Sequence, residues 1–288
     1  MRGFGWSRQS IRTCWIVLFT CFALLWAGQV PAQEEKEKKE GGGDLRSAVQ
    51  NPISSLISLP FKFTFDFGAP NGEATFLNIQ PVYPVTVGDW NLVSRLIVPL
   101  IDSPGEIAGT PDIPNPIPGK GATGLGDINY SMFFSPVKYD KIIWGVGPSI
   151  NFPSATNQQL GSGKWSAGPT AVLLTQPGWG SVGVLGRQLW SFAGQSDRTT
   201  VSQFLLEPFV NYNLPQGWFL ISDIIITANW KADSDNRWTV PLGGGVGKIF
   251  KIGTQAINSR IEAYYNVVKP DSAPNWQLTF TWQFLFPK

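Results

Sequence analysis

Large apolar residues alternate with polar ones along most of this chain. The stretch Phe61–Phe67 ("FKFTFDF") places phenylalanines on one side and Lys62, Thr64 and Asp66 on the other. The last stretch, Trp276–Phe286, repeats the pattern with large apolar residues set against glutamine and threonine. A period of two predicts β-strands with one apolar and one polar face. The apolar face then packs either on a protein core or on lipid.

The alternation recurs in twelve segments. Most reach the length of about 9–11 residues that a tilted strand needs to cross a bilayer. Two of them, 142–152 and 181–192, alternate less cleanly. We therefore expect an all-β fold, a transmembrane antiparallel up-and-down β-barrel of about 12 strands. The segments are roughly 60–68, 74–86, 90–101, 125–135, 142–152, 163–175, 181–192, 202–212, 218–230, 237–249, 257–267 and 276–286.

The connections between these segments alternate in length. Short turns on one rim and long loops on the other are typical of outer-membrane barrels, with the long loops outside. An even number of strands then places both chain ends on the short-turn side, in the periplasm. A secreted β-sandwich has no reason to sort its loops in this way. The compact connections lie near Gly88 and at 136–141, 176–180, 214–217 and 251–256, and the longer ones at 102–124, 153–162, 193–201, 231–236 and 268–275.

Closure of the barrel follows from the solvent. An unpaired backbone N–H or C=O costs several kcal/mol in hydrocarbon, so a set of spanning strands leaves no open edge. We expect the last strand, Trp276–Phe286, to pair with the first, Phe61–Phe67, and to turn its apolar face toward lipid.

The first 32 residues have the organisation of a secretory signal peptide. Arginines precede an apolar run from Cys14 to Ala27, and the small-residue exit Val30–Ala32 follows it. As a membrane anchor this run is short, because a spanning helix needs ~20 apolar residues. We predict cleavage near Ala32 and export to the outer membrane.

Residues 33–59 form a segment ahead of the barrel, which we place at 60–288. Glu34–Gly43 is charged and ends in glycines, as a flexible leader does. Asp44 is placed to cap a short helix that runs through Val49. The sequence leaves open whether this segment plugs the lumen.

The cysteines and the lack of histidine exclude several chemistries. Cys14 and Cys21 are the only cysteines, and both fall in the predicted signal peptide. The chain has no histidine, which excludes His-based catalytic triads and His-rich metal sites. Beyond residue 32 there are 19 basic and 20 acidic residues, a balance that does not indicate nucleic-acid binding. We expect no cofactor, no metal and no nucleic-acid partner.

Tryptophans mark the ends of many predicted strands. Amphipathic rings at both strand ends are what the two membrane interfaces favour. For any single tryptophan, core packing is the better explanation, but eight at strand ends favour two interface belts. These residues are Trp90, Trp165, Trp179, Trp190, Trp218, Trp230, Trp238 and Trp276.

An outward apolar face assigns the polar residues to the lumen. Charges of both signs there form a weakly selective constriction, or pair with one another and fill a narrow barrel. The sequence does not choose between these two. The charged residues are Lys62, Asp66, Arg95, Glu207, Asp223, Arg260 and Glu262, joined by Asn78, Gln80, Asn211, Gln277 and Gln283.

Seven blocks of this sequence resemble a known bacterial family. They are "NPISSLISLPFKF", "LNIQPVYPV", "GLGDINYSMFFSP", "IWGVGPSINFPSAT", "LGSGKWSAGPTAV", "QFLLEPFVNYNLPQGW" and "NRWTVPLGGGVGK". The family is commonly mislabelled "neuromedin U" and is related to outer-membrane transporters linked to phenol meta-cleavage pathways. The resemblance covers about Ser47 to Lys288 and implies a barrel with a transport role, without catalytic residues. Outer-membrane proteins usually end on an aromatic residue, whereas Pro287 and Lys288 follow Phe286 here.

These observations predict a passive outer-membrane channel or transporter for small solutes, with hydrophobic or aromatic molecules among the candidates. The alternative is a structural or adhesive barrel without an open pore. An enzyme is not expected, since histidine is absent and no paired acids stand out. The long loop Asp102–Gly124 serves either as an outer binding surface or as a gate that folds inward. The expected partners are outer-membrane lipid, the outer-membrane assembly machinery and a small-molecule solute.

Overall fold

The computed structural model describes residues 45–287. The predicted signal peptide (1–32) and the charged leader as far as residue 44 lie outside the described residues. The elements are α2 (Leu45–Val49), β1 (Ile57–Phe67), β2 (Ala74–Ile79), β3 (Val82–Val87), β4 (Trp90–Ser103), β5 (Ala122–Leu125), β6 (Ile128–Pro136), β7 (Ile142–Phe152), η1 (Gln158–Leu160), β8 (Lys164–Thr175), β9 (Gly180–Gly194), β10 (Ser202–Asn213), η2 (Pro215–Gly217), β11 (Trp218–Asp223), β12 (Ile226–Asn229), η3 (Ser234–Asn236), β13 (Trp238–Ile252), β14 (Gln255–Val268) and β15 (Trp276–Phe286).

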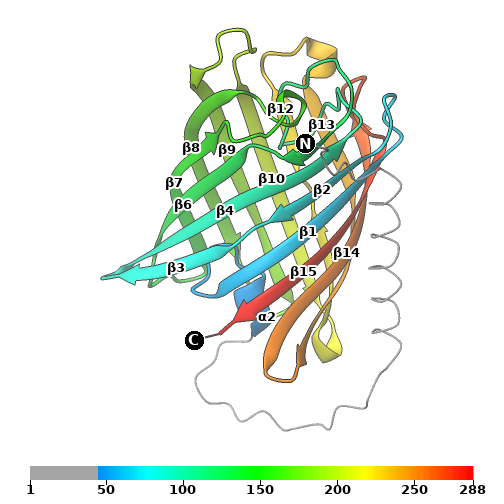
Figure 1. The fold of residues 1–288 in the computed structure, drawn as a ribbon. Helices are drawn as coiled ribbons and strands as arrows, with labels where there is room; N and C mark the ends of the chain where they lie inside the picture. The colour runs from blue at the N-terminus through cyan, green and yellow to red at the C-terminus, as the bar shows by residue number, and fades with distance from the viewer. Residues whose placement is uncertain (1–44, 288) are drawn as a thin grey trace, which may run out of the picture. The chain divides into compact units, whose positions relative to one another are not determined.

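The strands form one antiparallel sheet that closes on itself (Figure 1). The strand β1 pairs with β15, and β9 pairs with β10, so the ring is complete. Three crossings of the barrel wall are each made of two strands in succession: β2 and β3, β5 and β6, and β11 and β12. With each of these pairs counted as one crossing, the sheet is a closed twelve-stranded barrel. The predicted all-β antiparallel barrel is confirmed.

The first strand pairs with the last, as predicted. Phe67 lies opposite Trp276, and Ile57 lies opposite Phe286. On the outer face the rings of Phe67 and Trp276 stack with centroids 4.6 Å apart. Cross-strand aromatic pairs of this kind add to the backbone ladder that closes the barrel.

Two crossings are interrupted near prolines. Between β2 and β3 the ladder continues only through single bonds, from Gln80 N–H to Pro60 O and from Leu96 N–H to Pro81 O. Between β11 and β12, Ile224 N–H donates to Pro208 O at 3.3 Å. Proline has no N–H to give to a ladder, so regular pairing stops beside it.

The glycines of β13 allow its neighbour to approach closely. A Cβ on Gly243 would lie 2.0 Å from Ala263 O, and one on Gly245 would lie 1.9 Å from Ile261 O. Both oxygens belong to β14, so a side chain at either glycine would push the two strands apart.

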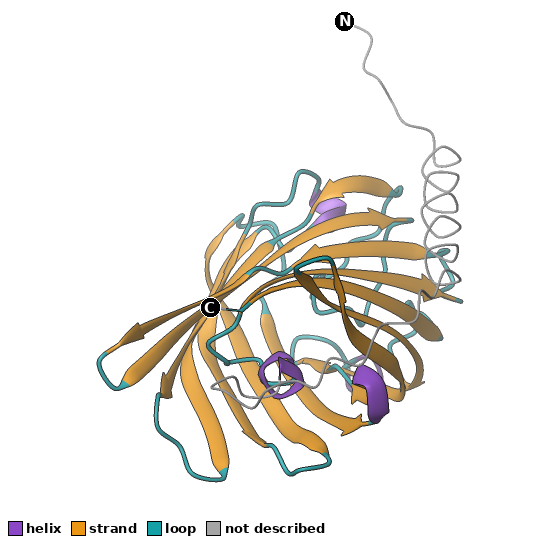
Figure 2. Ribbon diagram, turned by 90° about the horizontal axis from the view of Figure 1, so that it is seen from below, coloured by secondary structure: helices purple, strands orange, loops and turns teal. Residues whose placement is uncertain are grey.

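Short turns and long loops lie at opposite ends of the barrel. Figure 1 shows the connections after β1, β4, β7, β9, β12 and β14 at the top and the tighter turns at the bottom. The described chain enters and leaves at the short-turn end, because Ile57 and Phe286 are paired there. Viewed from that end, the strands form a ring around the lumen (Figure 2).

The outer surface is apolar and aromatic. Six of the eight selected tryptophans are 40–51 % exposed, and Trp218 and Trp238 are half-buried beneath neighbours. Trp238 packs edge-on against Trp230 at 5.5 Å. The sequence analysis did not select Trp144, which is also exposed. Its ring centroid lies 6.0 Å from that of Trp90. Within residues 45–287 no helix is long and apolar enough to cross a membrane.

The inner face carries buried apolar residues as well as the polar residues that the sequence analysis assigned to the lumen. Val93, Phe133, Ile143 and Leu174 are at most 3 % exposed and pack together inside the barrel. Segments 142–152 and 181–192 alternate poorly because β7 and β9 carry apolar residues on both faces. The strands β6–β10 therefore enclose an apolar core, while β13–β15 and β1 present polar residues inward.

A disulfide tests the pairing of the first strand with the last. Residues 33–288 contain no cysteine, so Thr64→Cys with Thr279→Cys, or Phe65→Cys with Leu278→Cys, should cross-link in the folded barrel. Close and wide cross-strand pairs alternate along an antiparallel ladder, so one of these two has the spacing a disulfide favours. Non-reducing gels measure the bond. Thr64→Cys with Gln203→Cys on β10 is the control that stays reduced. Closure would be wrong if both register pairs stayed reduced in a folded barrel.

Candidate functional site

The space inside the barrel forms two chambers. The lower chamber, of about 140 Å³, lies at the short-turn end. It is lined by several residues of the segment 48–60 and by residues of β1, β3, β4, β9–β11, β14 and β15. The upper chamber, of about 130 Å³, lies beneath the long loops, with Gly109–Asp112 in its lining. An apolar protein cavity of about 150 Å³ holds one benzene molecule. Each chamber thus has room for one small organic solute.

Residues 45–56, the floor segment, close the short-turn end of the lumen. Arg46 Nη1 donates to Leu214 O at 2.9 Å, and Gln50 Nε2 donates to Asn213 Oδ1 at 2.9 Å. From the barrel side, Gln176 Nε2 donates to Ser47 O at 2.6 Å. These bonds fix α2 to two short turns, so the floor is a docked part of the barrel.

One side chain anchors the floor segment in the apolar core. Ile53 is 2 % exposed and packs in the same cluster as Val93, Phe133 and Phe209. Burial of such a side chain contributes about 1.5–3 kcal/mol. The floor therefore closes the lumen through both hydrogen bonds and apolar contact.

The long loop after β4, residues 104–121, covers the other end. It folds into the mouth, where Ile107 and Ile113 are each 1 % exposed. Asn229 Nδ2 donates to Pro114 O at 2.9 Å, and Gln203 Nε2 donates to Pro111 O at 3.4 Å. The sequence left open an outer binding surface or an inward gate, and the loop lies inward. We call residues 104–121 the roof loop.

Acids fix both the roof loop and the neighbouring loop to the wall. Asn78 Nδ2 donates to Asp112 Oδ2 at 3.4 Å. Burial raises the pKa of Asp112, against this bond and the charges of Arg187 and Lys62. A raised pKa means that the inward position of Asp112 favours the protonated carboxyl. The stability of the inward position of the roof loop therefore falls as the pH rises above 3.8, the ordinary pKa of an aspartate.

Asp127 holds the loop that follows β7. Its Oδ2 accepts from Ser162 N–H and Ser162 Oγ, both at 2.7 Å, and its Oδ1 accepts from Ala155 N–H at 3.2 Å. Asp127 is 3 % exposed, so its carboxylate has lost most of its water. The three hydrogen bonds replace that water and explain why a buried acid is placed at this rim.

The two chambers meet at a set of residues that line both, which we call the junction ring. Its members come from six strands and from the break after β2. Five are ionisable residues that were predicted to face the lumen, and Leu185 is the one apolar member. The ring consists of Lys62, Gln80, Arg95, Leu185, Glu207, Asp223 and Arg260.

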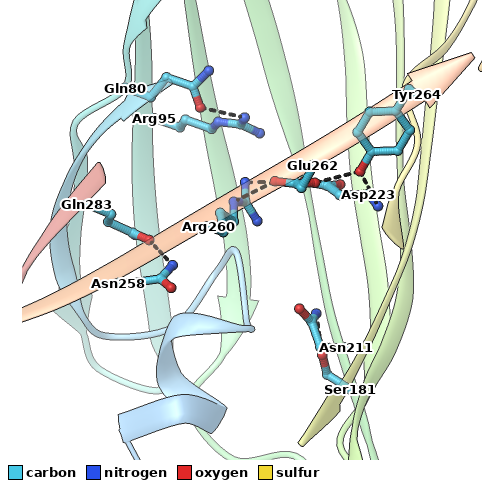
Figure 3. A network of polar contacts seen from close by, with 10 residues as sticks. All are labelled: Gln80, Arg95, Ser181, Asn211, Asp223, Asn258, Arg260, Glu262, Tyr264 and Gln283. Carbon is cyan, nitrogen blue, oxygen red and sulfur yellow. Dashed lines mark hydrogen bonds and ion pairs between the residues drawn. The ribbon is translucent and has the colours of Figure 1, made fainter. Parts of the chain in front are cut away.

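Part of the ring belongs to a closed network of hydrogen bonds and ion pairs (Figure 3). Arg260 lies 3.4 Å from Asp223 Oδ2 and 3.1 Å from Glu262 Oε1. Tyr264 Oη donates to Glu262 Oε2 at 2.5 Å and accepts from Asp223 N–H at 2.9 Å. Glu262 is 2 % exposed, so these groups compensate a charge that has lost its water.

The predicted lumen residues fall into three positions. Five of them belong to the junction ring: Lys62, Arg95, Glu207, Asp223 and Arg260. Asp66 lines the upper chamber but not the lower one. Glu262 is absent from both linings, because Arg260 and Tyr264 cover it. Residues that line the chambers and residues that pair their charges therefore occur side by side.

Sequence reasoning missed several lining residues. Arg187 projects from β9 into the upper chamber, where its charge and that of Arg95 repel each other. Asp112 reaches the same chamber from the roof loop. Leu185 and Phe209 were missed because a polar lining was expected. Arg187 lies two residues from Leu185, so the two share the inner face of the irregular segment 181–192. This spacing was the one feature of the sequence that could have predicted its inward position.

A search for metal-binding groups gives a negative result for the part of the chain described. Among residues 45–287, no group of three or more acidic residues, the only candidate ligands of that type in this range, is placed to hold a metal ion. The expectation that this chain uses no metal is left as a prediction.

Comparisons with known proteins identify the fold. No protein-family model matches this sequence, and no curated protein matches it. Among solved structures, the COG4313 outer membrane channel from Pseudomonas putida F1 is similar with a TM-score of 0.57 and 12 % identity, over 86 % of this chain and 100 % of that one. The NanC porin (TM-score 0.48, 11 % identity, 81 % and 100 % covered) and the Pseudomonas putida toluene transporter TodX (0.42, 10 %, 83 % and 93 %) are more distant. The chain thus shares the barrel fold of an outer-membrane channel.

Substitution of Arg260 tests the buried network. Arg260→Met leaves Glu262 without its cation, and we expect a loss of about 3 kcal/mol in the free energy of unfolding. Adding Glu262→Gln restores part of the loss, since it removes the uncompensated charge. Denaturant titration of the refolded barrel measures both values. Lys141→Met, on an exposed turn, is the control, with an expected change within about 0.5 kcal/mol. An equal effect of Arg260→Met and the control contradicts the network's role.

Proposed function

We propose that this protein is a passive outer-membrane channel for small solutes. The observation that supports the proposal is the pair of chambers, which meet at the junction ring along the barrel lumen. Polar and charged groups line the ring from several strands, as they do in water-filled constrictions. A solute passes from chamber to chamber once the roof loop and the floor segment move aside.

The long-loop rim faces the outside in this proposal, and the short-turn rim faces the periplasm. Both ends of the mature chain then lie in the periplasm, as in outer-membrane barrels generally. Residues 1–32 act as a cleaved signal peptide, and the outer-membrane assembly machinery inserts the barrel into lipid. Exposed tryptophans at both ends of the strands fit the two interfaces of such a membrane.

The lining favours solutes with an apolar part. In the lower chamber Phe209, Phe219 and Ile221 lie beside the polar residues of β14 and β15. Small hydrophobic or aromatic molecules fit a chamber of about 140 Å³. We further propose that the protein is not an enzyme, because the chain has no histidine and the lumen acids Asp223 and Glu262 compensate the charge of Arg260.

A structural barrel without an open pore is the second candidate. It is favoured by the closure of both ends and by the apolar core that fills the lumen beside β6–β10. In that case the lumen contacts serve stability alone. Release of the closures distinguishes this candidate from a channel.

Single-channel conductance of the refolded mature chain tests the channel proposal. We expect low conductance from the unaltered protein and clearly higher conductance from Arg46→Ala/Gln50→Ala/Ile53→Ala, which removes the anchors of the floor segment. Lys138→Ala, on an exposed turn, is the control. No increase in a folded triple variant, even after Asn229→Ala is added to release the roof loop, would favour the structural barrel.

Cysteine labelling tests the proposed orientation. Lys120 in the roof loop and Lys138 in a short turn are both exposed, and the mature chain has no other cysteine. Lys120→Cys should react with an impermeant maleimide on intact cells, while Lys138→Cys reacts only after the outer membrane is opened. The reverse result would invert the orientation.

A further inference from the structure

Four charges of the junction ring are separated by sign across the barrel. Lys62 lies on β1 and Arg95 on β4, whereas Glu207 lies on β10 and Asp223 on β11. Around the closed sheet, β6, β7, β8 and β9 separate β4 from β10, and β13, β14 and β15 separate β11 from β1. Lys62 and Arg95 therefore lie on one arc, and Glu207 and Asp223 lie on the opposite one. The fifth charge of the ring, Arg260 on β14, lies beside Asp223.

The cationic arc has no carboxylate in contact. Arg95 Nη2 donates to Gln80 Oε1 at 3.2 Å, which leaves its other guanidinium donors for a further acceptor. Within residues 45–287, neither Arg95 nor Lys62 forms an ion pair shorter than 4.0 Å. Both side chains are half-buried and line both chambers. An anionic group placed between them would gain two charge-assisted hydrogen bonds.

In the acidic arc one buried carboxylate oxygen has no donor among residues 45–287. Glu207 and Asp223 lie close enough for their carboxyl groups to share a hydrogen bond, while their charges repel each other. Arg260 contacts Asp223 through Oδ2 at 3.4 Å, but Oδ1 is buried without a hydrogen-bond donor among residues 45–287, and Asp223 as a whole is 8 % exposed. A buried carboxylate oxygen without a donor is costly, and a ligand N–H removes that cost.

An apolar wall adjoins the two arcs. Leu185 belongs to the ring itself, and Phe209, Phe219 and Ile221 continue its surface into the lower chamber. Three of these side chains are at most 6 % exposed and the fourth, Phe209, is 9 % exposed. A hydrocarbon group of a solute can pack on this wall without covering a hydrogen-bonding group of the protein.

We propose that the junction ring binds small zwitterions that carry an apolar group. The carboxylate of the solute contacts Lys62 and Arg95, and its ammonium group contacts Glu207 and Asp223. The apolar group packs on the wall that begins at Leu185. This assignment deepens the proposed channel function and rests on it, since it names the class of solute that the channel selects.

Singly charged solutes of the same shape satisfy only half of the ring. A monoanion leaves Asp223 Oδ1 without a donor and lies near the negative charge of the acidic arc. A monocation leaves the cationic arc without an acceptor. Beyond the ring, the upper chamber carries the cation Arg187 and the acids Asp66, Asp112 and Asp127. Charges removed from water are stable only when they are paired, so a ligand with both charges is favoured.

Three probes of matched shape test the proposal: leucine, 4-methylpentanoate, which lacks the ammonium group, and 3-methylbutylamine, which lacks the carboxylate. Their dissociation constants for the refolded mature chain are measured by ligand-observed NMR. We expect leucine to bind about tenfold more tightly than either ion, the factor that one charge-assisted hydrogen bond supplies. Equal binding of all three, tighter binding of one ion, or no binding of leucine would overturn the proposal.

A variant assigns the preference to the ring. Glu207→Gln should remove the preference for leucine over 4-methylpentanoate, while Asp140→Asn, on an exposed turn, should leave it unchanged. A preference that survives Glu207→Gln would also overturn the assignment. The NMR experiment measures binding and does not depend on transport. A negative binding result therefore contradicts only the zwitterion proposal, whereas the conductance of the floor-segment variant tests the channel proposal.

Discussion

The backbone hydrogen bond in hydrocarbon is the interaction on which the rest of this structure depends. Lipid offers no partner to an N–H or C=O group, so the spanning strands must pair with one another all the way around. The pairing of β1 with β15 over the full length of both strands completes that ring. Closure then fixes two unlike surfaces, because alternate residues of every strand face lipid and lumen. Exposed aromatic residues outside and buried polar residues inside are consequences of one ladder.

The lumen of such a ring must itself be filled or hydrated. Here it is divided: β6–β10 enclose an apolar core that Ile53 of the floor segment completes, while the opposite wall carries hydrogen-bonded polar groups. The charged residues lie where the chambers meet. The ladder is interrupted after Ile79 and after Asp223, so Gln80 and Asp223 of the junction ring stand beside strand breaks. Prolines near the same breaks remove backbone donors where the lining is polar, and the polar lumen tolerates the interruption better than a dry core would.

The alternation predicted the fold because it is imposed by lipid on every strand. The alternation predicted strands at Phe61–Phe67 and Trp276–Phe286. It also predicted that they pair with each other, because a closed barrel must join its first strand to its last. Arg187, by contrast, lies in a segment with apolar residues on both faces, where the period of two is lost. Asp112 enters the lumen on a loop, and no local pattern fixes the path of a loop held by distant residues such as Asn78 and Gln203. The sequence likewise did not distinguish Glu262, which is sealed by Tyr264, from Glu207, which lines both chambers.

Modification of one residue of the junction ring during a conductance recording tests the central claim, that the solute path runs through the ring. Leu185→Cys places the only thiol of the mature chain at this position. In the variant with a released floor segment, a small thiol reagent should react with it and reduce the current through the same channel. Reaction of this thiol without any change in current would show that ions bypass the ring, and the central claim would be wrong.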